Sequence, residues 1–441
     1  MFLAIEAFSI LLPLALILVL SKLLSILAKK IGLPQVIGLL MTGVILGAIA
    51  LIPLPDNMKE YAIFNDDAMD GIKFVAEIGV ILIMFSAGIE TDLKQIKKTG
   101  ISALVITLLG VMVPLGFGFL ASLILPQAET MTKTIFRNLF YGVILTATSV
   151  SVTIAALKEL GKLNTKIGTA IVSAAILDDI IGVIILSIII SLDKAMTSGG
   201  GNVGFDIGMV ILKTVLFFVF AIGLGILFRI LFKRLTEKYD HHRRIPIFAM
   251  AIAFFYSYAA EKWFGIADIT GAFFAGLVLS GLKDATYIER RTDITSYLLF
   301  TPVFFAKVGL TSMSSFTTGG GITLNFFFFG LLFILAGIAG KVLGCGVGAK
   351  ICKYNIKDSF RCGIGMMCRA EVCLICAQKG IDNNIVSASI QPFILVLILL
   401  TSFITPILLK LSYKNDKTNE DLTLFTANDN IEVNQGPSLD Q

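Results

Sequence analysis

The sequence predicts an all-α polytopic membrane protein with about 13 transmembrane helices. Of the 441 residues, 56% are hydrophobic and only 15% are charged, whereas soluble globular domains are about 25% charged. The apolar residues gather in runs of the ~20 residues that an α-helix needs to cross a bilayer. The stretches between these runs are short, so a separate soluble domain is not expected.

The apolar runs divide the chain into an expected transmembrane domain, 1–413, and a short tail, 414–441. Residues 1–6 lack the basic region of a signal peptide, so the first run is expected to be a retained helix. The tail is polar and acidic and is expected to be disordered in the cytoplasm. The candidate spans are 6–28, 33–54, 73–90, 101–125, 136–157, 167–192, 206–229, 245–262, 264–282, 296–313, 323–349, 359–379 and 387–412.

Lysine and arginine gather in alternate loops along the chain. Loops rich in Lys and Arg stay in the cytoplasm, so the pattern predicts a cell-membrane (inner-membrane) protein with its N-terminus outside and its C-terminus inside. The net charge of +5 reflects this topology and indicates no nucleic-acid partner. The basic loops lie at 29–30, 94–98, 158–166, 229–244, 283–291, 350–361 and 410–417.

Two adjacent carboxylates, Asp178 and Asp179, fall near the middle of the run 167–192. Ionisable side chains at membrane depth cost about 2.5–3.5 kcal/mol each, so they persist where they face a cavity or a partner. Adjacent helical residues point about 100° apart, so one carboxylate can face a neighbouring helix and the other a cavity. A desolvated carboxylate takes up either a proton or a cation, which predicts proton-coupled transport of a monovalent cation. The alternative is a pair that only holds helices together.

Two lysines also lie within apolar runs. Lys341 stands among glycines and aliphatic residues of the run 323–349, where an ammonium needs a buried anion unless it reaches the membrane interface. Lys307 is another cation at membrane depth, and the sequence indicates no partner for it.

Charges of opposite sign stand close together in the run 359–379. Arg369 and Glu371 are two residues apart and are expected to neutralise each other or to reach Glu90 or Glu77. A structural clamp and direct contact with a transported ion are both open for this group.

Hydroxyl residues crowd the middle of the run 136–157, where Thr148 and Ser149 follow Thr146. Such residues weaken a helix centre because their side chains compete for backbone hydrogen bonds. An unwound segment would free oxygens of Thr148 and Ser149 to coordinate Na⁺, as broken helices do in transporters. Hydroxyls that bond back to their own helix are the alternative. The C-x-x-C at Cys373 and Cys376 has no second C-x-x-C to complete a zinc site, so no cofactor is expected.

Short motifs with a specific order and spacing identify a family. The chain resembles bacterial monovalent cation:proton antiporters of the second cation–proton antiporter group, which includes NapA-like exchangers and the transmembrane domain of Kef-like exchangers. One departure is Cys368-Arg369-Ala370-Glu371, where the family often has Pro-Arg-Gly-Glu. The motifs are LPQVIG (33–38), FSAGIE (85–90), ATSV (147–150), LDD (177–179), GAFFAG (271–276), GKVLG (340–344) and RAEV (369–372).

The resemblance implies an NhaA-type fold of inverted repeats with two crossing broken helices. It further implies a homodimer built from a core domain (about 73–192 and 323–412), a dimer domain (about 6–54 and 245–313) and a linker helix (206–229). Asp179 would carry the cation and the proton, and would thus be the Na⁺ ligand. Asp178 would pair with Lys341, and the two-aspartate form is associated with electrogenic exchange.

The expected function is Na⁺/H⁺ antiport by alternating access, without enzymatic chemistry. K⁺/H⁺ exchange by the same machinery stays open, because side-chain types do not determine the size of the oxygen cage around Na⁺, Li⁺ or K⁺. An intramembrane aspartyl protease is a distant alternative, since its two aspartates must face each other from separate helices. A channel is disfavoured because no filter loop is repeated in the chain.

Overall fold

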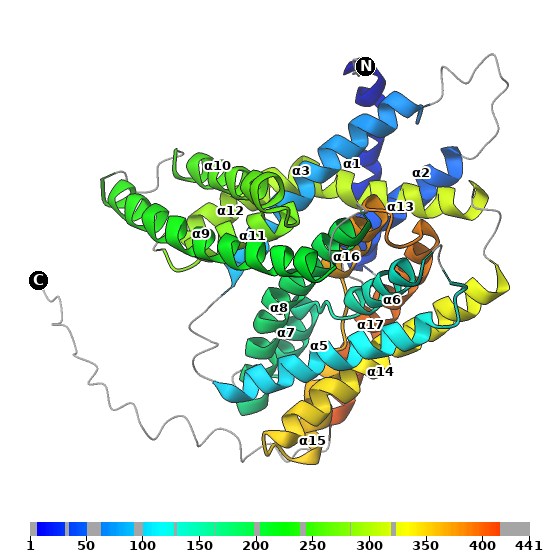
Figure 1. Cartoon of the computed structure of the whole chain (residues 1–441), viewed down its shortest axis with the longest axis vertical. Coiled ribbons are helices and arrows are strands. Elements are labelled where there is room, and N and C mark those ends of the chain that lie inside the picture. The colour runs from blue at the N-terminus through cyan, green and yellow to red at the C-terminus, as the bar shows by residue number, and fades with distance from the viewer. Residues whose placement is uncertain are drawn as a thin grey trace, which may run out of the picture.

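The computed structural model describes residues 7–30, 35–50, 63–91, 100–127, 130–163, 165–197, 203–238, 244–282, 284–318 and 323–414, and regular structure within these ranges is helical (Figure 1). Eight helices in these ranges are long and apolar enough to cross a membrane. The predicted all-α class is therefore confirmed, whereas the count of about thirteen spans stays a prediction. Residues 415–441 of the predicted tail lie outside the described ranges.

One group of helices, here called the scaffold bundle, comes from the first fifth of the chain and from its third quarter. α2 packs on α1 and α13, and α3 packs on α11, α13 and α12. Close packing depends on glycine: a side chain at Gly88 of α3 would meet the backbone of α11, and one at Gly276 of α11 would meet α3. The members are α1 (Ala7–Lys30), α2 (Gln35–Ala50), α3 (Asp66–Glu90), α10 (Arg244–Ala259), α11 (Asp268–Leu279), α12 (Ala285–Thr295) and α13 (Thr301–Thr318).

The other group, here called the core bundle, combines the second quarter of the chain with its C-terminal quarter. α5 packs along α14, and α8 contacts α5, α6 and α15. The members are α5 (Ile101–Ser122), α6 (Met131–Ile144), α7 (Val150–Glu159), α8 (Lys166–Thr197), α14 (Leu324–Ile351), α15 (Ile356–Gly365), α16 (Glu371–Asp382) and α17 (Gln391–Tyr413).

The long helix α9 (Val203–Lys238) contacts both bundles, through α8 on one side and α10 and α11 on the other. The role of the run 206–229 as a linker helix stays a prediction. In Figure 1, α9 runs across the junction between the two bundles.

Two details of the packing differ from the sequence prediction. The run 73–90 was expected in the core domain, but α3 packs on α1 and α10–α13 of the scaffold bundle, because Gly88 of α3 and Gly276 of α11 allow the two backbones into contact. Residues 283–295 were expected as a loop, but α12 continues through the π-helical turn η3 (Ser296–Phe300) into α13. No glycine or proline stands between Ala285 and Thr301 to end that helix.

Two helices of the core bundle are broken and cross each other. The run 136–157 forms α6 and α7 with a break at 145–149, and the run 359–379 forms α15 and α16 with a break at 366–370. The breaks touch, because the Ser149 N–H donates to the carbonyl oxygen of Cys368 at 2.8 Å. The predicted pair of crossing broken helices is present.

Candidate functional site

The hydroxyl-rich segment contacts the opposite broken helix rather than its own. Thr148 Oγ1 donates to the carbonyl oxygen of Met366 at 3.4 Å, and Thr153 Oγ1 donates to that of Gly365 at 2.6 Å. Thr146 follows the alternative considered from the sequence, since its hydroxyl donates to the carbonyl oxygen of Val143 in its own helix. The segment is thus unwound, with polar groups gathered where the two breaks meet.

Arg369 holds the crossing together from within. Its side chain is fully buried, and its Nη2 donates to the carbonyl oxygens of Leu145 at 2.7 Å and Gly337 at 3.1 Å. Leu145 caps the C-terminal end of α6, where the helix dipole concentrates negative partial charge. The guanidinium therefore satisfies the Leu145 carbonyl that the break leaves open, and through Gly337 it ties the break to α14. The side chain of Glu371 lies outside the described residues, so its pairing with Arg369 stays a prediction.

The first of the adjacent aspartates, Asp178, points into the core bundle. Its Oδ1 lies 2.6 Å from Nζ of Lys341 on α14, and both side chains are 0% exposed. Neither charge could remain at this depth alone, because an unpaired buried ion loses its hydration without compensation. The pair joins α8 to α14.

The second aspartate, Asp179, faces a cavity of about 750 Å³ and is half-buried. The same cavity is lined by Thr148 and Ser149 of the first break and by Val372 at the start of α16. Carboxylate and hydroxyl oxygens are the ligands that small hard cations prefer. The cavity therefore brings together oxygen atoms of the kind that bind small hard cations.

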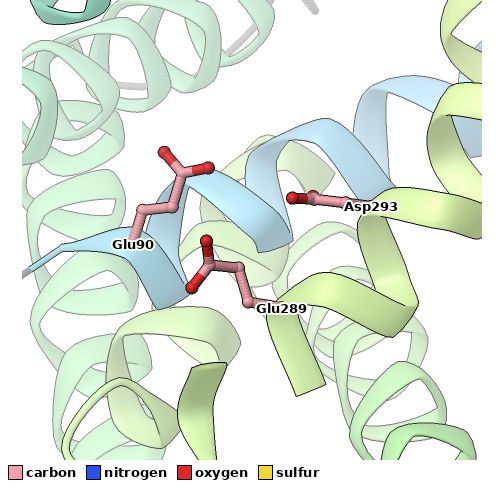
Figure 2. Close-up of side chains that lie close together, drawn as sticks. All are labelled: Glu90, Glu289 and Asp293. Carbon is pink, nitrogen blue, oxygen red and sulfur yellow. The ribbon is translucent and has the colours of Figure 1, made fainter. Parts of the chain in front are cut away.

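Further carboxylates gather around the same cavity. Glu90 at the end of α3 and Asp293 of α12 both line it. With Glu289, they place carboxylate oxygens within 4.8 Å of one another (Figure 2). Glu90 was expected as an ion-pair partner, and the structure places it in this acidic group. The negative potential of the acidic group raises the local concentration of cations.

Glu289 and Asp293 were not predicted, although the sequence contained a signal. They stand four residues apart, a spacing that places two side chains on one face of a helix. Because residues 283–295 were expected to form a loop, the helical spacing of these two carboxylates was not recognised as a shared helix face.

The cysteines of the C-x-x-C are buried and not in a disulfide. Cys373 Sγ lies 3.4 Å from the carbonyl oxygen of Ile144, at the end of α6. This is the setting of a small side chain packed in the crossing.

Comparison with known families decides the identity. Residues 15–411 match the family described as sodium/hydrogen exchanger, transmembrane. The chain belongs to this family. The exchanger is therefore a multi-pass membrane transporter, and the intramembrane protease considered from its aspartates is excluded.

Relatives cover nearly the whole exchanger. It is 31% identical over 398 residues to a Na⁺/H⁺ antiporter of Enterococcus hirae, covering 90% of this chain and 96% of the relative. It is 32% identical over 399 residues to the Na⁺/H⁺-K⁺ antiporter GerN of Bacillus cereus, covering 90% of this chain and 95% of the relative. Its fold resembles that of a sodium proton antiporter from Methanocaldococcus jannaschii, with a TM-score of 0.67 and 19% identity, covering 91% of this chain and 95% of that one.

Proposed function

We propose that the exchanger is a Na⁺/H⁺ antiporter in which Asp179 holds the cation and the proton in turn. The observation that carries the proposal is the setting of Asp179. It shares a cavity with Thr148 and Ser149 at the crossing of two broken helices. Its neighbour Asp178 is already engaged by Lys341. The relative from Enterococcus hirae is named a Na⁺/H⁺ antiporter, and the relative GerN from Bacillus cereus is named a Na⁺/H⁺-K⁺ antiporter.

The exchange follows from competition for one carboxylate. A cation drawn toward the acidic group around Glu90 enters the cavity and reaches Asp179. There it displaces the proton, and oxygens of Thr148 and Ser149 replace part of its hydration shell. Either occupant neutralises the carboxylate, so the loaded site can cross the low-dielectric region that an ionised, empty site cannot.

The Asp178–Lys341 pair is proposed to make the exchange electrogenic. A cation bound at Asp179 repels the ammonium of Lys341 and competes with it for the nearby negative charge. Lys341 then releases a proton, and takes one up again when the cation leaves. One cycle would move two protons for one Na⁺, one on Asp179 and one on Lys341.

Alternating access is proposed to arise from movement of the core bundle against the scaffold bundle, with the scaffold bundle forming a homodimer. The broken helices and Asp179 belong to the core bundle, whereas α3, α12 and α13 supply the facing wall of the cavity. The distribution of basic loops would open this cavity to the cytoplasm, because α3 leads from it into the basic loop 94–98.

Purified protein in liposomes with an internal pH dye tests the proposed activity. An outward or inward Na⁺ gradient should drive proton movement in the opposite direction, and protein-free liposomes should show none. Running Li⁺ and K⁺ beside Na⁺ separates the cation classes. Proton movement with K⁺ alone would replace the proposal by K⁺/H⁺ antiport, and no response to any cation would refute antiport.

A further inference from the structure

On three helices, α8, α16 and α3, the residues that line the cavity lie toward one end of the helix. On α8 its lining residues are Val172, Ile176 and Asp179, all in the N-terminal half. On α16 the lining residue is Val372, in the first turn. On the antiparallel α3 the lining residues run from Ile83 to Glu90, at the C-terminal end.

Beyond Asp179, polar side chains join the core bundle to the scaffold bundle. Ser187 of α8 shares a hydrogen bond with Thr270 of α11. Ser191 Oγ donates to the carbonyl oxygen of Gly265, just before α11, at 2.8 Å. Ser187 stands eight residues after Asp179, which is about 12 Å farther along α8.

Two lysine–aspartate pairs occupy the same junction. Lys379 Nζ of α16 lies 2.6 Å from Oδ1 of Asp268 at the start of α11. Lys307 Nζ of α13 lies 3.6 Å from Oδ1 of Asp382 at the end of α16. Each pair therefore has one member in the core bundle and one in the scaffold bundle, unlike Asp178 and Lys341.

The pairs are largely buried but not sealed, and a neighbour orients one of them. The side chains of Lys379 and Asp268 are 17% and 12% exposed, and those of Lys307 and Asp382 are 9% and 26% exposed. Gln378 Nε2 donates to Asp382 Oδ1 at 2.8 Å, which orients that carboxylate. The remaining exposure gives these ions a route to solvent when the two surfaces separate, so the pairs can break without leaving a charge sealed inside the protein.

We propose that Asp268–Lys379 and Lys307–Asp382 form a latch that closes the exchanger on the side of Asp179 opposite to the cavity. The inference rests on the proposed antiport by alternating access. In each cycle both pairs break as the core bundle moves, the junction at Ser187 and Thr270 opens, and Asp179 becomes accessible from the latch side. This gives Lys307 a function as a positioning residue that never touches the transported ion.

A disulfide across the junction tests whether the latch must open. The double variant Ser187→Cys with Thr270→Cys should exchange at the normal rate when reduced. Oxidation should lower its exchange rate at least ten-fold, and a reductant should restore the rate. Each single variant serves as the control for oxidation of the native cysteines. Full exchange by the cross-linked protein would overturn the latch, whereas no exchange by the wild type would refute the proposed antiport instead.

Charge variants test the latch without a cross-link. An impermeant maleimide added from the latch side should label Thr270→Cys at least about five-fold faster when one pair is neutralised, because the closed junction then loses one of the ion pairs that hold it. The neutralising changes are Lys307→Gln and Lys379→Gln, and the matched control is Lys350→Gln, an exposed lysine at the end of α14.

Exchanging the two charges of one pair distinguishes a latch from a contact that only stabilises the fold. Asp268→Lys with Lys379→Asp should return the labelling rate of Thr270→Cys to within about two-fold of the parent, because the attraction is restored. An unchanged rate after neutralisation of both pairs would overturn the proposal. So would labelling that rises equally in the Lys350→Gln control.

Discussion

Asp178 and Asp179 are neighbours in the chain but occupy opposite settings in the fold. Asp178 is sealed between α8 and α14 with its charge cancelled by Lys341, whereas Asp179 is half-buried and lines a cavity of about 750 Å³. The difference arises from the rotation of about 100° between successive helical residues. It shows how one helix can place a buried ion pair and a cavity-facing carboxylate side by side.

The comparison predicts its largest effect at Asp179. Asp179→Asn keeps the size of the side chain but removes the charge that binds a proton or a cation, so exchange should fall at least 100-fold. The variant should remain folded, because Asp178–Lys341 and the helix crossing are intact. Dye-based transport in liposomes measures the rate, and size-exclusion chromatography checks the fold. Substantial exchange by this variant would contradict the role of Asp179.

The next effect concerns the stability of the sealed pair. Lys341→Ala leaves Asp178 charged and without its partner in a dry environment, and such losses cost about 3–5 kcal/mol. Lys341→Gln combined with Asp178→Asn replaces two charges by two neutral amides and should recover part of that stability. Thermal unfolding in detergent compares the three proteins, and equal stability of the single and double variants would argue against the pair.

The same double variant tests whether the buried pair makes the exchange electrogenic. Without the proton on Lys341, any remaining exchange should be electroneutral, one proton for one Na⁺. Transport is measured at potentials clamped with valinomycin and K⁺, provided that K⁺ is not itself transported. The two-proton scheme would be refuted if the exchange rate of the wild type did not depend on the imposed potential, or if that of the double variant still did.

A smaller effect is expected at the hydroxyl ligands beside Asp179. Thr148→Val and Ser149→Ala each remove one side-chain oxygen while backbone carbonyls remain, so the apparent KM for Na⁺ should rise a few-fold with little change in kcat. The corresponding control is Thr214→Val, a buried hydroxyl on α9 that bonds its own helix. An unchanged KM in both site variants would assign these hydroxyls to structure alone.

The smallest effect belongs to the acidic group of Glu90, Glu289 and Asp293. Glu90→Gln with Asp293→Asn should raise the apparent KM for Na⁺ about two-fold at low ionic strength, because a long-range attraction is lost. At high ionic strength the effect should vanish, since salt screens charges that are separated by more than a Debye length. A change that persists at high salt would mean that these carboxylates contact the ion directly.

Of the two helix breaks, only the one in the run 136–157 could be predicted from local composition. Its hydroxyl residues weaken the helix, and the break falls at 145–149. The break at 366–370 contains no proline or glycine, so local propensity gives little reason for it. Tertiary contacts hold it open instead. The Arg369 N–H donates to Thr401 Oγ1 at 3.1 Å, and Ser402 Oγ donates to the carbonyl of Arg369 at 3.3 Å.

The sequence alone determined that the chain is a helical membrane protein with ionisable groups at membrane depth, because hydrocarbon tolerates such groups only where they have a partner or a cavity. It also determined that Asp178 and Asp179 diverge, since helical rotation is a local property. Only the tertiary structure decided which neighbour each one meets. The grouping of α3 with α11, the acidic group around Glu90 and the pairing of Lys307 with Asp382 all join residues distant in sequence. Such contacts depend on how whole helices pack, and no local pattern encodes that.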